Sequence, residues 1–148
     1  MLKKFSFFIT LLGVLLFSAS SFAQSADAIL GKWINPSGEG QIQIYKKGSL
    51  FYGKLAWLKQ PNDETTGQPK TDKNNPDKNL HSRPILGLEI LKDFKFDGES
   101  VYDDGNIYDP KNGKIYSCKM TLNGNKLKIR GYIGISLLGR SEIWTRVK

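Results

Sequence analysis

Three carboxylates close together in the sequence, Asp103, Asp104 and Asp109, are the side chains best suited to chemistry. Paired carboxylates at short spacing occur in sugar hydrolysis, where one is an acid and the other a base or nucleophile. Adjacent residues of a strand point to opposite faces, however, which would separate Asp103 from Asp104. Asp109 precedes Pro110 at a predicted turn, where an aspartate commonly caps the backbone. We therefore predict no catalytic residues, and a hydrolytic enzyme is the least favoured class.

The single histidine, His81, and the single cysteine, Cys118, are the other reactive side chains. His81 has no second histidine or cysteine with which to share a metal, so we predict a solvated loop residue and no metal site. Cys118 alternates with Met120 and Leu122 in a strand-like pattern, which predicts a buried thiol and excludes an internal disulfide. No helix follows the glycines near the C-terminus, so neither a phosphate-binding loop nor a cofactor is expected.

Turn signals divide the chain from Gln24 onward at even intervals, with short β-like stretches between them. The pattern predicts eight strands, near 28–35, 40–46, 49–58, 87–96, 100–109, 114–122, 126–133 and 140–147. Hairpin-linked strands of this number close most economically into a barrel, because closure removes exposed edges. The predicted fold class is all-β, an up-and-down antiparallel β-barrel with one long loop.

The period of two predicts which side chains face the barrel interior. Three sets are expected to point inward: Ile42 and Ile44; Phe51, Gly53, Leu55 and Trp57; and Leu127, Ile129, Gly131 and Ile133. An eight-stranded barrel has room for its own side chains or for one small ligand. We predict ligand contacts from four aromatic residues and one arginine: Tyr45, Trp57, Arg83, Tyr108 and Tyr116.

Residues 59–84 break the even spacing, because they contain four of the six prolines and almost no apolar side chain. Loops this long are usually lids, binding loops or disordered segments. We predict a loop folded over one barrel opening, with disorder as the alternative, and a fixed turn at Asn75-Pro76-Asp77. Arg83 would anchor this loop by binding loop carbonyls or Asp109. The competing interpretation is a solvated arginine at a strand entrance.

The first 23 residues have the pattern of a secretory signal peptide. Two lysines precede an apolar run from Phe5 to Phe17, and Ser21 and Ala23 supply the small residues of a cleavage site. We expect cleavage between Ala23 and Gln24, no lipid anchor and no later transmembrane span. The expected product is a periplasmic or secreted monomer with one domain, residues 24–148.

Charge is unevenly distributed along the chain, which has 22 basic and 14 acidic residues. From Lys111 onward nine basic residues accompany one acid, Glu142, whereas residues 97–109 contain five acids and no base. Cross-strand pairs between these segments would explain part of the asymmetry. The remaining basic face could meet an anionic surface of lipid or glycan in the cell envelope. Nucleic-acid binding is not expected of an exported chain without a recognition motif.

Four stretches carry a resemblance to a known family: Gly31-Lys32-Trp33, Asn75-Pro76-Asp77 followed by RPILGLEIL, GNIYDPKNGKIYSCKM, and RGYIGISLLGRSEIWTR. Together they resemble the bacterial family catalogued as domain of unknown function 2147, over nearly all of the chain after Gln24. The resemblance implies an exported β-barrel akin to lipocalins and streptavidin, with no established activity and no catalytic residues to carry over. The stretch from Leu88 to Pro110 is more acidic than this family leads us to expect.

The wider lipocalin-like pattern places a Gly-x-Trp in the first strand and an arginine across the indole near the last strand. Trp33 matches the first part, and Arg140 or Arg146 could supply the second, through a cation–π contact of about 1–2 kcal/mol. Gly131 and Gly134 are expected where a strand bends or approaches a neighbour. The full set with a predicted structural role is Gly31, Trp33, Asp109, Pro110, Gly113, Gly131, Gly134, Arg140, Trp144 and Arg146.

Three hypotheses for function follow. The first is a carrier or sensor for a small, partly apolar molecule in the cell envelope, with Tyr45, Trp57 and Tyr116 as its aromatic lining. The second is a packed barrel without a cavity that binds an envelope protein or lipid through its surface. The third, an enzyme, ranks last. A cavity inside the barrel would separate the first two hypotheses.

Overall fold

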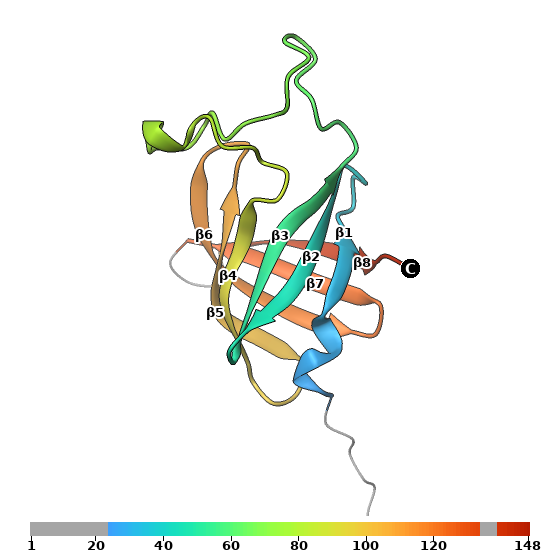
Figure 1. The fold of residues 1–148 in the computed structure, drawn as a ribbon. Helices are drawn as coiled ribbons and strands as arrows, with labels where there is room; N and C mark the ends of the chain where they lie inside the picture. Colours follow the sequence, from blue (N-terminus) through green and yellow to red (C-terminus); the bar gives the residue numbers. More distant parts are fainter. Residues whose placement is uncertain (1–23, 134–138) are drawn as a thin grey trace, which may run out of the picture.

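The computed structural model describes residues 24–133 and 139–148, which form a closed antiparallel barrel (Figure 1). Its strands are β1 (Gly31–Ile34), β2 (Gly40–Lys47), β3 (Leu50–Leu58), β4 (Glu89–Phe96), β5 (Val101–Asp109), β6 (Lys114–Asn123), β7 (Lys126–Tyr132) and β8 (Arg140–Arg146). Each strand pairs with the next in the chain, and β8 pairs with β1. The predicted all-β, up-and-down barrel is therefore confirmed.

The predicted first strand, 28–35, is the one element that differs in kind. A 3-10 helix, η1 (Ala26–Ile29), occupies its first part, and β1 begins only at Gly31. The Ser25 side chain caps this turn by accepting a hydrogen bond from the Asp27 N–H at 3.3 Å. A short apolar stretch before a strand therefore forms a helical turn, whose residue Ile29 is fully buried against the core.

Two glycines allow large side chains to fill the middle of the barrel. A Cβ added at Gly105 would lie 2.5 Å from the ring of Phe94, and one at Gly53 would lie 2.7 Å from the Leu91 Cδ1 atom. Phe94 and Leu91 are both fully buried. Each such buried side chain stabilises the fold by about 1.5–3 kcal/mol. Around β3, β4 and β5 the interior is therefore occupied by the protein's own side chains.

The predicted inward faces are largely confirmed. Buried residues include Ile42, Ile44, Phe51, Leu55, Leu127 and Ile129. Trp57 is an exception, since it is 41% exposed. The strand register shifts between Gln41 and Ile42, which oppose Trp57 and Leu55, so one extra residue in β3 reverses the alternation. Leu58 packs against the core instead.

Ile133 is the second exception to the predicted faces, at 69% exposed. It follows the last residue of β7, Tyr132, and so lies beyond the paired part of the strand. The inward prediction for Ile133 is therefore wrong, because alternation predicts burial only where the strand faces the core.

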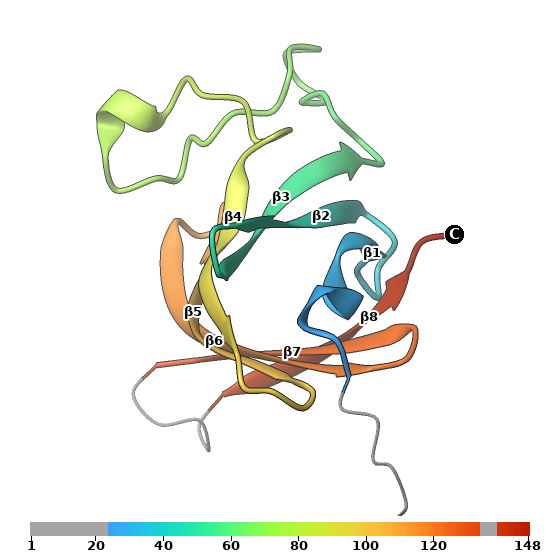
Figure 2. The same ribbon diagram turned by 60° about the horizontal axis from the view of Figure 1, so that its bottom comes forward.

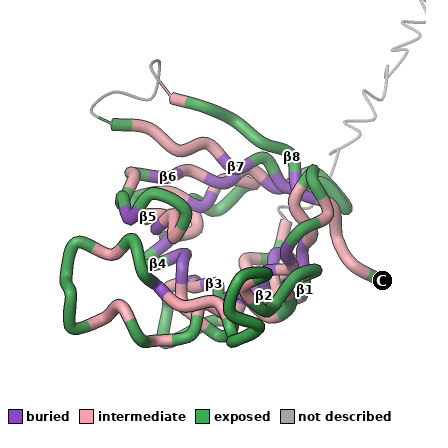
Figure 3. The backbone as a smooth tube through the Cα atoms, turned by 90° about the horizontal axis from the view of Figure 1, so that it is seen from above, coloured by how far each residue is buried: buried purple, intermediate pink, exposed green. Residues whose placement is uncertain are grey.

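The two ends of the barrel differ. Figure 2, with the η1 end turned forward, shows the strands as a ring with β2 and β3 opposite β7 and β8. At the other end the long connection between β3 and β4 includes a second 3-10 helix, η2 (Lys78–Leu80). This connection extends outward to one side of the ring, with mostly exposed or intermediate residues (Figure 3). No helix within the described ranges is long and apolar enough to cross a membrane.

Candidate functional site

The η1 end of the barrel is closed by Arg146, the last residue of β8. Its guanidinium carbon lies 4.3 Å from the centroid of the Trp33 ring. Its two terminal nitrogens donate to the backbone carbonyls of Leu30 and Ala28, at 2.9 and 2.6 Å. The Trp33 Nε1 donates to the Ile29 carbonyl at 2.9 Å. Arg146 therefore takes the predicted place across the indole.

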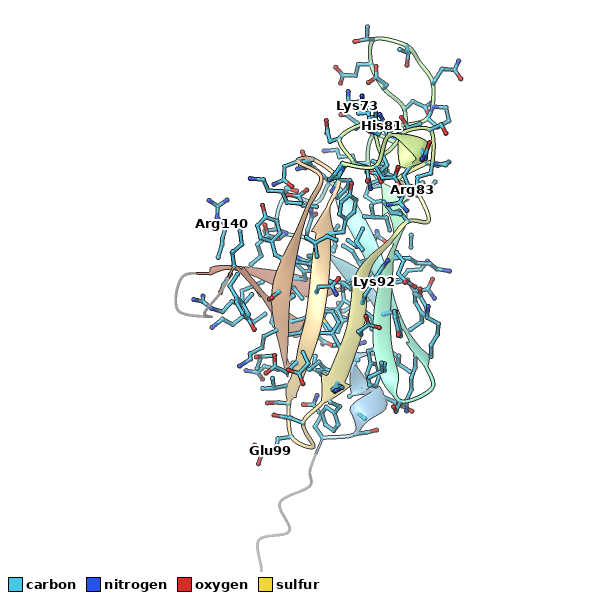
Figure 4. The ribbon with its side chains drawn as sticks, turned by 90° about the vertical axis from the view of Figure 1, so that its left-hand side faces the viewer. Lys73, His81, Arg83, Lys92, Glu99 and Arg140 are labelled. Carbon is cyan, nitrogen blue, oxygen red and sulfur yellow. The ribbon has the colours of Figure 1, made fainter. Side chains whose placement is uncertain are left out.

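Arg140 does not share that place. It lies at the opposite end of β8, where it pairs with Gly131 of β7. In Figure 4 its side chain projects from the hairpin, away from the barrel ring. Of the two arginines proposed from the sequence, the structure therefore selects Arg146 for the contact with Trp33.

An open depression of about 400 Å³ lies beside the closed η1 end. It is bordered by η1, the turn between β2 and β3, and the end of β4, and we call it the η1 depression. Its lining residues are Ala26, Lys46, Ser49, Leu50, Phe51, Lys95 and Phe96. Phe51 is 1% exposed, so the base of the depression is part of the core. Tyr102 packs against both phenylalanines, with ring centroids 5.1 and 4.9 Å away.

Two lysines give the η1 depression its charge. The Lys46 Nζ lies 5.5 Å from the Phe51 ring centroid and 3.0 Å from the Asp27 carboxylate of η1. Lys95 makes no ion pair within residues 24–133 and 139–148, and the Asp103 carboxylate opposite it is bound by Lys119 at 3.4 Å. An apolar base with cations at the rim suits a molecule with an apolar body and an anionic group.

Asp72 organises the other end of the barrel and is fully buried. Its Oδ1 accepts a hydrogen bond from the Tyr108 hydroxyl at 2.5 Å. Its Oδ2 accepts from the Arg83 Nε at 2.8 Å and the Asn75 Nδ2 at 2.9 Å, and a terminal Arg83 nitrogen also lies 2.8 Å away. We call Asp72, Asn75, Arg83 and Tyr108 the Asp72 cluster. It joins the β3–β4 connection to β5.

The Asp72 cluster favours the ionised carboxylate. Burial raises the pKa of Asp72, but the hydrogen bonds from Tyr108, Asn75 and Arg83 and the Arg83 charge outweigh it. The net pKa of Asp72 is therefore below its usual value. The burial of Tyr108 and its hydrogen bond to Asp72 raise the pKa of the Tyr108 hydroxyl. The hydroxyl therefore stays protonated and remains a hydrogen-bond donor.

A second contact fixes the β3–β4 connection to the turn between β5 and β6. The Asn74 Nδ2 donates to the carbonyls of Pro110 and Lys111, at 3.1 and 3.0 Å. Gly113 has φ +71°, and a Cβ added there would lie 1.9 Å from the Asn74 carbonyl oxygen. Glycine is thus required at this position both by the backbone conformation and by the close approach. The connection is fixed beside the barrel opening rather than folded across it.

The predicted anchor role of Arg83 is supported by these contacts, although its partner is Asp72 and not Asp109. Asp109 instead caps its own turn, as expected, by accepting from the Lys111 N–H at 2.9 Å. His81 is not simply solvated, because its Nε2 lies 2.6 Å from the Asn75 carbonyl oxygen. Figure 4 places Arg83 and His81 together in the connection above the barrel.

The residues predicted to contact a ligand do not converge on one site. Tyr45 lies on the outer wall, where it stacks on Tyr52 at 6.1 Å and donates to the Glu89 carboxylate. Ile44 is buried, and adjacent residues of a strand point to opposite faces, so Tyr45 must point outward. The prediction that Tyr45 lines the interior is therefore wrong. Trp57 also points outward. Tyr116 is half-buried near the opposite end from the η1 depression, and its hydroxyl accepts from the Asn112 amide at 2.9 Å.

Several residues of both ends gave no signal in the sequence. Asp72 is one of several acids in a polar segment, and nothing near it predicts burial. Lys46, Lys95 and Phe96 come from two strands and meet only when the barrel closes. The one usable signal was the alternation in β2 and β3, which places Phe51 inside.

The remaining structural predictions have mixed outcomes. Trp144 is buried, at 3% exposed, and Cys118 is fully buried as predicted. Burial raises the pKa of the Cys118 thiol to about 12. A Cβ at Gly131 would meet its nearest atoms at ordinary distances of 3.6 and 3.7 Å, so close approach does not require glycine there. Gly134 lies outside the described residues, as does the predicted signal peptide.

Comparisons with known proteins agree with this architecture. The family profile described as "Uncharacterized protein conserved in bacteria (DUF2147)" matches residues 31–146. A solved structure, protein HP1028 from Helicobacter pylori, described as belonging to the lipocalin family, superposes with a TM-score of 0.69 and 22% sequence identity. The match covers 80% of this chain and 82% of that one, and it concerns the fold alone. No match was found among the curated proteins.

Proposed function

The chain belongs to the DUF2147 family, and from that premise and the geometry above we propose that it binds a small amphipathic anion in the cell envelope. The ligand lies in the η1 depression, with its apolar part against Phe51 and Phe96 and its anionic group near Lys95. The observation that carries the proposal is the coincidence of a core-lined base with a rim lysine, Lys95, that makes no ion pair within the described residues.

The packed middle of the barrel favours this end site over an internal one. Phe94 lies against Gly105 and Leu91 against Gly53, at distances that leave no room even for a methyl group. A ligand that entered between β3, β4 and β5 would have to displace these side chains, at a cost of several kcal/mol. The lipocalin-like fold is compatible with small-ligand binding, and the η1 depression is the location that we propose for it.

Calorimetric titration of residues 24–148 with dodecanoate tests the proposal. We expect saturable binding that Lys95→Ala weakens by about tenfold, since a hydrogen bond to a charged group contributes about 1.5 kcal/mol. Lys92→Ala is the matched control, because Lys92 is an exposed lysine of the same strand outside the η1 depression. Equal affinity for dodecanol would contradict the anionic group, and equal weakening by both variants would contradict the site.

The envelope location is part of the proposal and rests on the sequence pattern of residues 1–23. N-terminal sequencing of the protein from a periplasmic fraction is the direct test. We expect the product to start at Gln24. A product that starts at Met1 would remove this part of the proposal without affecting the ligand site.

A further inference from the structure

The outer face of β7 carries a row of three cationic side chains. Lys126, Lys128 and Arg130 alternate with the buried residues of β7, so all three point outward. Successive outward residues of a strand are about 7 Å apart, which makes this a straight row of charges. Ile143 of β8, which is 47% exposed, lies directly opposite Lys128. We call Lys126, Lys128, Arg130 and Ile143 the β7 wall.

The cross-strand partners of Lys126 and Lys128 are neutral, and Lys119, which lies opposite Arg130, is paired with Asp103 at 3.4 Å. Lys126 donates to the Thr145 hydroxyl at 3.2 Å, and Arg130 donates to the Ser141 hydroxyl at 3.0 Å. On the β6 side Thr121 lies opposite Lys128, and Asn123 lies opposite Lys126. The Thr145 hydroxyl holds Lys126 without cancelling its charge, and neither Lys126 nor Lys128 forms an ion pair within residues 24–133 and 139–148.

The opposite wall shows how this protein balances charge elsewhere. Lys47 lies 3.1 Å from the Glu89 carboxylate and 4.0 Å from the centroid of the Tyr52 ring. The Tyr52 hydroxyl in turn donates to Asp93 at 2.7 Å. Carboxylates are therefore interleaved with cations on β2, β3 and β4, which lie across the ring from β7 and β8 (Figure 2). On β6 and β8, by contrast, the residues opposite Lys126 and Lys128 include no carboxylate.

We propose that the β7 wall docks the protein on the surface of an anionic lipid bilayer. A row of cations along one strand matches an extended plane of phosphate groups, whereas a small soluble anion would need donors that converge on one point. Ile143 adds an exposed apolar side chain beside Lys128, which could contact the headgroup region. This surface is distinct from the η1 depression, so the inference does not depend on the proposed ligand.

Vesicle sedimentation of residues 24–148 tests this inference. The shorter chain is used because the apolar run 5–17 would bind lipid by itself, and every strand of the barrel lies within 31–146. We expect binding to phosphatidylcholine vesicles that contain phosphatidylglycerol, little binding to pure phosphatidylcholine, and loss of binding at high salt. Lys126→Gln combined with Lys128→Gln should lower the partition coefficient on the order of 30-fold, from about fivefold per cation.

The matched control is the double variant Lys54→Gln and Lys92→Gln, which removes the same charge from exposed lysines on β3 and β4. Retained binding by this control, with loss in the Lys126 and Lys128 variant, supports the β7 wall. Equal loss in both variants would overturn it in favour of net charge alone. Equal binding to neutral vesicles, or binding to heparin with none to anionic vesicles, would also overturn it. Circular dichroism of each variant checks that the barrel is intact.

Discussion

The two ends of the barrel are each held by an arginine beside an aromatic ring, yet the arginines differ in their partners. Arg146 lies 4.3 Å from the Trp33 ring and donates to two backbone carbonyls, which are neutral. Arg83 lies 5.9 Å from the Tyr108 ring and pairs with the buried carboxylate of Asp72. Only the second arrangement contains a group that gains a proton in acid.

The closure at the η1 end is therefore independent of pH, whereas the attachment of the β3–β4 connection depends on the charge of Asp72. At the η1 end the partners of Arg146 are fixed by the backbone, and Trp33 is itself fully buried. At the other end the β3–β4 connection is held by the Asn74 contacts and by Asp72, whose contribution depends on its ionisation. We therefore expect the η1 end to determine global stability and the Asp72 cluster to determine the local stability of the connection.

The largest expected effect is on the η1 end. Trp33→Ala should lower the free energy of unfolding by about 3–5 kcal/mol, because it removes a buried indole and the surface that Arg146 covers. Chemical denaturation measures this change. Tyr108→Phe, which removes one hydroxyl from the Asp72 cluster, is the comparison and should cost about 1–2 kcal/mol. A larger loss for Tyr108→Phe would reverse the comparison between the ends.

The next effect concerns the carboxylate of Asp72. Asp72→Asn should cost about 1–3 kcal/mol, since a neutral amide accepts the Arg83 bonds less well and solvent screens the partly exposed guanidinium. Hydrogen exchange should rise in residues 59–84 and stay unchanged around Trp33. The control is Glu64→Gln, which alters an exposed acidic side chain of the same connection. Uniform faster exchange over the whole barrel would contradict a local role.

Arg83→Ala should loosen the same connection, because it removes the guanidinium that binds Asp72. We expect limited proteolysis within 59–84 to accelerate by much more than the melting temperature falls, because the barrel strands keep their pairing. Lys73→Ala serves as the control, since Lys73 is an exposed cation of the same connection. Equal cleavage rates in Arg83→Ala and the parent protein would remove the anchor role.

A pH series sharpens the comparison further. The folded pKa of Asp72 is lowered, so its contribution is complete above the unfolded value of about 3.9 and is lost as pH falls through the folded value. Pepsin cleavage within 59–84 should therefore increase below about pH 4, after correction for pepsin activity on an unstructured peptide. Asp72→Asn should abolish this dependence. The same pH dependence in the variant would assign it to another group.

The smallest effect concerns Cys118, which belongs to neither end. Because the thiol is fully buried and its pKa is raised to about 12, a bulky thiol reagent should react slowly in native buffer and rapidly after denaturation. Labelling followed by mass spectrometry measures the two rates. Fast native labelling would mean that β6 exposes this face, contrary to the register with β7.

The sequence predicted the strands and their order because alternation and turn residues are local signals. It also predicted that an arginine near the end of the chain would cover Trp33, since that arrangement accompanies the Gly-x-Trp pattern. It did not predict Asp72, because burial of a loop carboxylate depends on three partners brought by the tertiary fold. The error at Trp57 arose from a single extra residue in β3, which alternation cannot reveal.

The closure between β1 and β8 has a consequence for how the molecule forms. These two strands pair only through Trp33 with Arg146 and Ile34 with Thr145. Every other strand pair joins neighbours in the chain, so these seven pairings can form early. Six of them close hairpins, and the β3–β4 pair closes a longer loop. The eighth joins the two ends of the barrel sequence and must bear the largest loop-closure entropy. We therefore expect the β1–β8 seam to be the last strand pair to form in folding.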